Sequence, residues 1–359
     1  MTLLPVAVMP VKIGNDGSGR SNIMLKRRSL GLAMVASPFI SRRLRAEDSV
    51  VRISKQYGLG YMSMMVMEHE HLVERHAAKQ GLPGVTTEWS VLGGPTPQID
   101  ALLAGQIGFI GPGSTTLATL WDKTAGTGRD IKALSALQSM PFVLMTRNAA
   151  VRSIADLTPA DKIALPGVKI TGHALTLEMA AAKQWGFPAF DRLDSLTVTL
   201  AHPDAMATLL GGKSEINCHM ASSPFYYYER AAPGVHEVFK SYDVTGGMHT
   251  NGVVLTSKAY HDANPKICAA VLGAQQEAND FIRTYPRQAA EIYLTLTTDK
   301  NGTVDQMAGW VADPDVVYTT VPMKVMEFAA FMHKVGRLKR QPDSWKDMFF
   351  PETQDTAGS

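Results

Sequence analysis

The segment Leu92–Trp121 constrains the fold most, because it predicts two helix starts around one short strand. It reads LGGPTPQIDALLAGQIGFIGPGSTTLATLW. Thr96 can cap a helix that begins at Pro97, where a missing N–H costs nothing, and Gly105 ends that helix. The apolar run Ile107–Ile110 then predicts a strand.

A second loop, Gly111–Ser114, leads into another helix that carries Leu117, Leu120 and Trp121. In a parallel sheet, both loops of the segment lie at the same edge, above the strand ends. Both helix N-termini then point unpaired N–H groups and positive dipole ends at one place. This arrangement suits a small polar ligand, and the alternative is an ordinary α/β unit whose glycines only make turns.

A later segment repeats this pattern. The run His202–Ile216 echoes Thr96–Phe109, since each has Pro near the helix start, paired leucines and a glycine before a short strand. Each strand is followed by a loop, Gly111–Ser114 in one copy and Ala221–Pro224 in the other. The shared spacing predicts two lobes of similar build.

The rest of the chain also alternates between strand and helix patterns, which predicts an α/β fold. Further strands are expected at residues 50–54, 85–91, 131–138, 142–147, 162–165, 196–200 and 253–256. Further helices are expected at 62–80, 171–186, 264–281, 286–294, 303–310 and 323–335, with a short turn at 153–157.

Composition excludes some classes of function. The net charge of +2, without a basic stripe among aromatic residues, does not indicate a nucleic-acid partner. Cys218 and Cys268 form no metal motif and are expected to be unpaired thiols. Histidines and glutamates in the helix Met62–Gln80 lack HExxH order and predict a solvated face. The methionines of that helix predict gap-filling core packing.

The N-terminal part predicts export from the cytoplasm. Lys26, Arg27 and Arg28 precede the apolar segment Leu30–Ile40, which is too short to span a membrane, and Ala46 is a candidate cleavage point. The Arg27-Arg28 pair resembles a twin-arginine signal. Residues 1–48 are therefore expected to be a leader with the signal at 24–46, and a basic amphipathic tail is the alternative.

Several short marks together resemble a known family, with the following residues in order: Ala101–Phe109, Ser153–Leu157, Lys162–Gly167, Leu209–Lys213 with Pro224, and Asn264-Pro265 opening a helix toward Tyr285-Pro286. From about Val50 to about Leu294 the chain resembles the periplasmic substrate-binding proteins of ABC importers in the nitrate, sulfonate, taurine and thiamine-precursor group. It departs from the family pattern at Gly108, where a small acidic residue is usual, and at Ser214–Ile216, where a Gly-Asp pair is usual.

The resemblance implies a two-lobed α/β fold of the type II-like periplasmic binding proteins, with a ligand cleft between lobes joined by two strand crossings. The first lobe would comprise residues 49–141 plus 253–350 and the second 142–252, with a loose tail at 351–359. It implies a periplasmic monomer that closes on a small molecule by a hinge motion and delivers it to ABC permease subunits, without a cofactor, metal or covalent chemistry.

The expected ligand-binding residues lie in loops that reach such a cleft. They are Tyr61, Gly94, Pro95, Thr96, Ser114 and Thr115 from the first lobe, Thr171, Gly172, His173, Ser222 and Pro224 from the second, and His249 near the second crossing. For each Ser or Thr the alternative is helix capping. The run Tyr226–Tyr228 either walls a ligand ring or packs inside its lobe.

The ligand class stays open between an oxyanion, a sulfonate, a carboxylate and a neutral heteroaromatic compound. No arginine lies in the expected loops, so a bidentate arginine clamp is not expected. An enzyme related to the pyrimidine-forming branch of the family and a ligand sensor are the alternative functions. Against an enzyme, the sequence has no GxSxG, P-loop, complete GxGxxG or CxxC motif.

Overall fold

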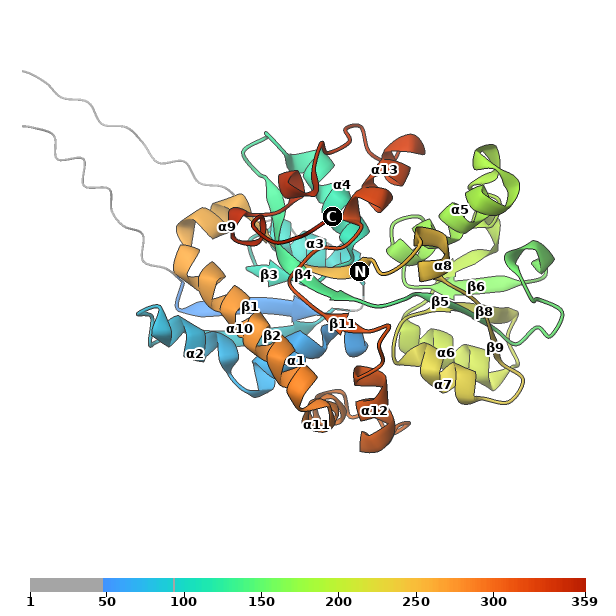
Figure 1. The fold of residues 1–359 in the computed structure, drawn as a ribbon, viewed down its shortest axis with the longest axis horizontal. Helices are drawn as coiled ribbons and strands as arrows, with labels where there is room; N and C mark the ends of the chain where they lie inside the picture. The colour runs from blue at the N-terminus through green and yellow to red at the C-terminus, as the bar shows by residue number, and fades with distance from the viewer. Residues whose placement is uncertain (1–47, 93) are drawn as a thin grey trace, which may run out of the picture. The chain divides into compact units, whose positions relative to one another are not determined.

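The computed structural model describes residues 48–92 and 94–359, which contain two β-sheets surrounded by helices (Figure 1). The first sheet has the strand order β11-β4-β10-β3-β1-β2. Its strands are β1 (Val50–Lys55), β2 (Thr86–Val91), β3 (Phe109–Ile110), β4 (Ile131–Ser139), β10 (Thr250–Ser257) and β11 (Val317–Tyr318). Strands β1, β2 and β3 are parallel, while β10 runs antiparallel to both β3 and β4.

The second sheet has the order β7-β6-β8-β5-β9. Its strands are β5 (Val143–Thr146), β6 (Lys162–Leu165), β7 (Thr197–Thr199), β8 (Ile216–Ala221) and β9 (His236–Lys240). Strand β6 is parallel to β7 and β8, and β5 is antiparallel to β8 and β9. The chain passes from β4 to β5 through Met140–Phe142 and returns to the first sheet with β10.

Helices cover both sheets. Those that follow strands of the first sheet are α1 (Met62–His69), α2 (Leu72–Lys79), α3 (Pro95–Leu103), α4 (Ser114–Thr124), α9 (Lys258–Ala263), α10 (Pro265–Thr284), α11 (Pro286–Thr297), α12 (Val304–Val311) and α13 (Val325–Lys334). Those of the second sheet are α5 (Gly172–Trp185), α6 (His202–Gly211), α7 (Phe225–Ala231) and α8 (Ser241–Thr245). Short 3₁₀ turns are η1 (Leu59–Tyr61), η2 (Ile154–Asp156), η3 (Phe187–Ala189), η4 (Asp194–Leu196), η5 (Trp345–Met348) and η6 (Pro351–Thr353).

The core of the first sheet is rich in methionine. Met62, Met64, Met65 and Met67 of α1 are all buried and pack against α10 and α11. This confirms the predicted core role of these residues, since the flexible thioether side chains fill space between helices. Cys218 and Cys268 are both buried, and no disulfide joins them, as expected.

The predicted helix over residues 62–80 is two helices. His71 takes a left-handed backbone conformation with φ of 51° between α1 and α2, so the helical hydrogen-bond ladder is interrupted there. The predicted solvated face is partly covered, since His76 Nε2 lies 2.8 Å from Glu277 Oε2 of α10. Within residues 48–92 and 94–359, no group of three His, Cys, Asp or Glu is placed to hold a metal ion.

The last residues are packed, contrary to the expected loose tail. Thr353 is buried and its hydroxyl donates to the Leu134 carbonyl of β4. The amide of Ser359 donates to Pro322 at 3.0 Å, and the amide of Val325 donates to Ser359 at 2.9 Å. The polar sequence does not predict this packing, because hydrogen bonds rather than apolar side chains hold the segment.

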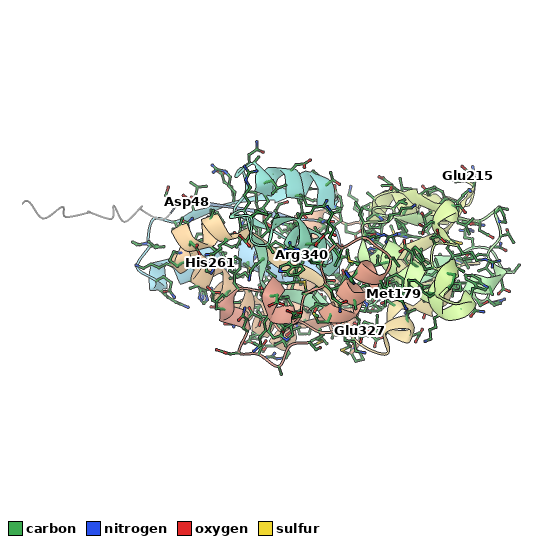
Figure 2. All side chains as sticks on the ribbon, turned by 90° about the horizontal axis from the view of Figure 1, so that it is seen from above. Asp48, Met179, Glu215, His261, Glu327 and Arg340 are labelled. Atoms are coloured by element: carbon green, nitrogen blue, oxygen red, sulfur yellow. The ribbon has the colours of Figure 1, made fainter. Side chains whose placement is uncertain are left out.

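Contacts also join helices of the two sheets. Figure 2 shows Met179 of α5 near Glu327 of α13, and Met179 packs against the apolar cluster that contains Phe328. The predicted leader and signal lie outside the described residues, apart from Asp48. None of the described helices combines the length and the apolar character that a membrane span requires.

Candidate functional site

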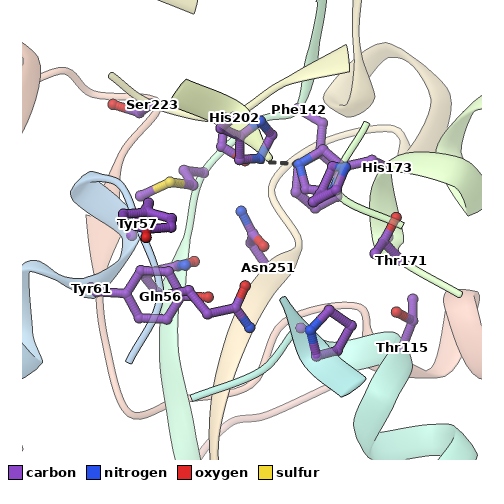
Figure 3. A pocket seen from close by; sticks show the side chains of 18 of the residues that line it. Gln56, Tyr57, Tyr61, Thr115, Phe142, Thr171, His173, His202, Ser223 and Asn251 are labelled. Carbon is purple, nitrogen blue, oxygen red and sulfur yellow. Dashed lines mark hydrogen bonds between the residues drawn. The ribbon is translucent and has the colours of Figure 1, made fainter. Parts of the chain in front are cut away.

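One cavity is lined by loops and helix starts from both sheets (Figure 3). The first sheet, its following loops and the start of the crossing contribute Gln56, Tyr57, Gly60, Tyr61, Pro95, Gly113, Thr115, Thr116, Gln138, Met140 and Asn251. The crossing and the second sheet contribute Phe142, Pro166, Thr171, Gly172, His173, His202, Ser222 and Ser223. The cavity therefore lies where the two halves of the fold meet.

The structure brings seven of the expected site residues together in this cavity wall: Tyr61, Pro95, Thr115, Thr171, Gly172, His173 and Ser222. The loops that carry them follow the carboxyl ends of parallel strands, where ligands of α/β sheets usually bind. Five expected residues lie elsewhere.

These five residues support the loops or point away from the cavity. Helix α3 begins at Pro95, and Gly94 stands at its N-cap with φ of 146°. Thr96 is therefore inside the helix, where it is exposed, and the expected threonine cap is wrong. Ser114 donates to the Thr250 carbonyl at 2.8 Å. Pro224 stands at the N-cap of α7, and His249 is buried with Nε2 2.7 Å from the Ser241 hydroxyl.

Three helices begin at the cavity. Gly113 precedes α4, Thr171 precedes α5, and His202 is the first residue of α6. The first N–H groups of a helix have no partner inside the helix, and its dipole makes this end positive. The cavity is therefore favourable to an acceptor-rich or negatively charged group.

The hydroxyl groups expected to bind a ligand are mostly engaged within the protein. Thr115 Oγ1 donates to the Ile170 carbonyl at 3.2 Å, which joins α4 to the loop before α5. Thr171 Oγ1 donates to Gly167 at 2.8 Å and accepts the amide of Ala174, so it caps α5. In this structure Thr171 therefore acts as the N-cap of α5, which is the alternative role that the sequence left open.

We expect Ser114→Ala to lower the free energy of unfolding by about 1–2 kcal/mol, because it removes a buried hydrogen bond to Thr250. Thr96→Ala is the matched control and should change stability by less than about 0.5 kcal/mol, because Thr96 is exposed and caps nothing. Urea denaturation of both variants measures the difference. Equal losses would contradict the assigned role of Ser114.

Two polar groups in the cavity wall are free of protein partners. Neither the Tyr61 hydroxyl nor the Asn251 amide hydrogen-bonds another side chain or backbone group of the described residues. Figure 3 shows the Asn251 amide in the middle of the view, between the rings of Tyr61 and His173. Burial of Tyr61 raises the pKa of its phenol above the usual value, so it offers a neutral O–H group.

The two histidines of the cavity are neutral. Burial, followed by the nearby His202, His219 and His249, holds the pKa of His173 well below its usual value. Burial and His219 do the same to the pKa of His202. His173 Nε2 lies 2.8 Å from the Ser222 hydroxyl, while its buried Nδ1 has no hydrogen-bond partner in the described part of the chain.

All the cavity-lining side chains are uncharged, since none is Lys, Arg, Asp or Glu. A ligand would therefore meet helix N-termini, neutral hydrogen-bonding groups and the rings of Tyr61 and Phe142. Phe142 packs against His173 with a centroid distance of 4.0 Å. This combination provides orientation and hydrogen bonding without an ion pair.

Glycines allow the walls of the cavity to approach closely. A Cβ atom at Gly172 would lie 2.8 Å from Cε2 of Phe142, and one at Gly60 would lie 2.8 Å from Nε2 of Gln138. At Gly58, with φ of 103°, a Cβ atom would lie 2.7 Å from the Ser223 carbonyl. The Leu59 amide donates to that carbonyl at 3.0 Å, so loops of the two sheets touch beside the cavity.

The tyrosine run packs instead of walling the cavity. Tyr227 stacks on Trp310 of α12 at 5.0 Å, and its hydroxyl donates to Asp313 at 2.6 Å. Tyr228 donates to Asp299 at 2.9 Å, and Tyr226 is buried. These contacts join α7 to the segment that follows α11.

Comparisons with solved structures identify the fold. The alkanesulfonate-binding protein SsuA from Xanthomonas axonopodis pv. citri, bound to MOPS, matches with 17% identity over 82% of this chain and 96% of its own, at a TM-score of 0.62. The periplasmic nitrate-binding protein NrtA from Synechocystis matches with 14% identity over 84% and 85%, at 0.63. The chain has the periplasmic binding protein fold. No family model matches it, and the search of curated proteins found no match.

The same fold occurs in a Candida albicans protein described as defining a new family with the generic periplasmic binding protein fold. It has 13% identity over 84% of this chain and 96% of its own, with a TM-score of 0.61. At these identities the likeness concerns the fold alone. The function therefore has to be argued from the cavity.

Sequence reasoning missed Asn251 and His202 as cavity residues. Asn251 directly follows His249 and Thr250, near the expected second crossing, so its position held a usable signal. His202 opens the repeated segment and was assigned only to the helix start. Gln138 lies in a strand and carried no sequence signal that distinguishes it from core residues. Phe142 lies at the expected boundary between the lobes, so its position also held a usable signal.

Proposed function

We propose that this protein is the extracytoplasmic solute-binding component of an ABC importer, which captures a small anionic or polar organic ligand and delivers it to a membrane permease. The carrying observation is the cavity between elements of the two sheets, where three helix N-termini meet free neutral hydrogen-bonding groups. The fold, shared with sulfonate- and nitrate-binding proteins, supports this role.

In the proposed mechanism, residues 49–141 plus 253–350 form one lobe and residues 142–252 form the other. Ligand binding favours the closed state because both lobes contact the ligand only there. The hydrogen bonds Thr115–Ile170 and Leu59–Ser223, on loops of different sheets, are candidates for contacts made on closure. The permease would recognise that closed form, and the protein would act as a monomer in the periplasm.

A screen tests the proposed function directly. Mass spectrometry of small molecules released from the purified protein comes first. Thermal-shift measurements with nitrate, bicarbonate, sulfonates including MOPS, aromatic carboxylates and pyrimidines follow. A ligand present at about 100 times its dissociation constant should stabilise the fold by about 2.7 kcal/mol. Turnover of one of these compounds, without stable binding of any, would contradict the proposal.

The Asn251 side chain gives a sharper prediction. We expect Asn251→Ala to weaken binding of the compound found in the screen about tenfold, since about 1.4 kcal/mol of hydrogen bonding is lost. Asn251→Asp keeps the shape but adds a negative charge. If the ligand is an anion, the aspartate variant should bind more weakly than the alanine variant.

Asn301→Ala, at an exposed position outside the cavity, serves as the control and should bind the ligand normally. Calorimetric titration of the three variants measures the affinities. Unchanged affinity in both Asn251 variants would show that the ligand does not reach this residue.

An enzyme is the second candidate, and one observation favours it. The Ser222 hydroxyl and His173 Nε2 are 2.8 Å apart in the cavity, which is the distance between a nucleophile and its general base. No third group orients His173, because Nδ1 lacks a partner among the described residues, and the lowered pKa makes it a weak base. Loss of turnover in Ser222→Ala, for any compound of the screen, would favour the enzyme.

A further inference from the structure

Behind the cavity, three buried titratable groups form a continuous hydrogen-bonded row. His202 Nδ1 lies 2.8 Å from His219 Nε2, and His219 Nδ1 lies 2.5 Å from Glu229 Oε1. His202 starts α6 at the cavity wall, His219 lies on β8, and Glu229 lies on α7. His219 and Glu229 are fully buried, so the row leads from the cavity into the interior.

The cavity end of the row is open to a ligand. His202 uses Nδ1 toward His219, and Nε2 makes no hydrogen bond with another residue of the described ranges. At the interior end, Glu229 Oε2 is buried and has no hydrogen-bond partner there. An ionised carboxylate with one unpartnered oxygen is costly in the interior, which favours a proton on this row.

The number of protons on the row determines whether His202 Nε2 is a hydrogen-bond donor or acceptor toward the cavity. With two protons on the row, Glu229 is ionised and accepts from His219 Nδ1–H. His219 Nε2 then accepts from His202 Nδ1–H, and His202 Nε2 is left as a bare acceptor. A bare nitrogen would repel an anionic oxygen at that point.

With three protons, His202 presents an Nε2–H donor to the cavity whichever group holds the extra one. If Glu229 or His219 holds it, His219 Nε2–H donates to His202 Nδ1, and the remaining proton of His202 sits on Nε2. If His202 itself holds it, both ring nitrogens are protonated. In each arrangement His202 Nε2–H is a donor toward the cavity.

We propose that the Glu229–His219 pair is a proton store that sets His202 Nε2 as a hydrogen-bond donor, so that the cavity selects ligands with an acceptor atom at this point. The acceptor would be an oxygen of a small anion or an unprotonated ring nitrogen. The statement about ligands rests on the proposed solute-binding function, while the proton count does not. Glu229 is then a positioning residue for recognition.

The surroundings do not supply a fixed charge that would replace this proton. The other titratable or charged groups on the elements around the row are His173, Glu178 and Lys183 on α5, Asp204 on α6, Tyr226, Tyr227, Tyr228 and Arg230 on α7, Cys218 on β8, Lys162 on β6, Arg147 after β5, and His236, Glu237 and Lys240 on β9. Arg230 pairs with Glu237, and Arg147 donates to backbone carbonyls of Leu209 and Leu210. Burial raises the pKa of Glu229 well above its usual value, in agreement with a stored proton.

The test uses the ligand-free protein with ¹⁵N-labelled histidine, followed by NMR over the pH range in which it is folded. Comparison with His202→Asn assigns the His202 signals. We expect the proton of His202 to be on Nε2 at neutral pH and to exchange to Nδ1 as the pH rises and Glu229 gives up its proton. In Glu229→Gln this exchange should be lost, because the titrating carboxyl is gone.

Glu237→Gln is the matched control, since Glu237 pairs with Arg230 and not with a histidine, and it should keep the exchange. A wild-type His202 that keeps one tautomer throughout, or an exchange that persists in Glu229→Gln, would overturn the proposal. The wild-type titration decides the matter even where the Glu229 variant does not fold. A failed ligand screen would overturn the proposed function but would leave this result intact.

Discussion

Lowering the pH from about 6.5 to about 4.5 is expected to destabilise the protein by about 5 kcal/mol, close to the whole stability of many domains. Four buried histidines cause this loss. Burial lowers the pKa of His249 to about 4 and of His219 to about 3, and holds the pKa of His173 and His202 well below 6.5. Below pH about 6.5 the unfolded chain therefore binds more protons than the folded one, which favours unfolding as the pH falls.

Two buried carboxyl groups act in the opposite direction and are included in that figure. Burial raises the pKa of Glu178 to about 7 and that of Glu229 well above its usual value, so folded protein holds their protons where the unfolded chain loses them. Their contribution to stability is present at low pH and is lost as the pH rises toward the folded-state pKa. The histidines prevail because there are twice as many of them.

Urea denaturation at several pH values measures the free energy of unfolding as a function of pH. The variant His249→Gln isolates the contribution of one histidine. The variant should lose about 2 kcal/mol less than the wild type over the same interval, because it lacks one buried titrating ring. His71→Gln is the control, since His71 is exposed, and it should follow the wild-type curve. A stability that is flat between these pH values would contradict the neutral, buried state of the four rings.

Closing the cavity at Gly172 is expected to abolish ligand binding, with a loss of at least about 100-fold. In Gly172→Leu, the new Cβ would lie 2.8 Å from Cε2 of Phe142, and the rest of the side chain would occupy the cavity at the start of α5. Overpacking of this kind also costs about 1–3 kcal/mol of stability. Affinity for the compound found in the screen and urea denaturation give the two effects separately.

Gly211→Leu is the matched control, because Gly211 ends α6 and a Cβ atom there meets nothing within 4 Å. This variant should bind the ligand as the wild type does. If Gly172→Leu binds normally as well, the ligand site lies outside this cavity and the proposed function loses its main support.

Local sequence patterns predicted many elements well. The strand Lys162–Leu165 and the start of α5 after Thr171 have the expected bounds, since an apolar run and a helix cap are local signals. Strand β9 was not predicted, because all of its residues are half-buried and show no alternation. The left-handed His71 was also missed, since the sequence on both sides of it favours helix.

The candidate site was predicted in part, for a similar reason. Thr171, Gly172 and His173 follow a predicted strand and open a predicted helix, so their place at a sheet edge could be foreseen. The placement of Asn251 depends on the pairing of β10 with β4, and the orientation of His202 depends on its partner His219. Such pairings join residues that are distant in the sequence, and no local pattern encodes them.

The sequence by itself determined the alternation of strands and helices, the repeated helix start with proline and paired leucines, and the absence of arginine from the expected binding loops. These properties follow from propensity, periodicity and composition, which act over a few residues. The tertiary structure alone decided which hydroxyls already hydrogen-bond the protein, and that the Tyr61 hydroxyl and the Asn251 amide do not. It also decided that His202 is hydrogen-bonded to His219, which in turn is hydrogen-bonded to Glu229. These depend on burial and on partners brought together only by folding, since the cost of an unpaired polar group arises where water is excluded.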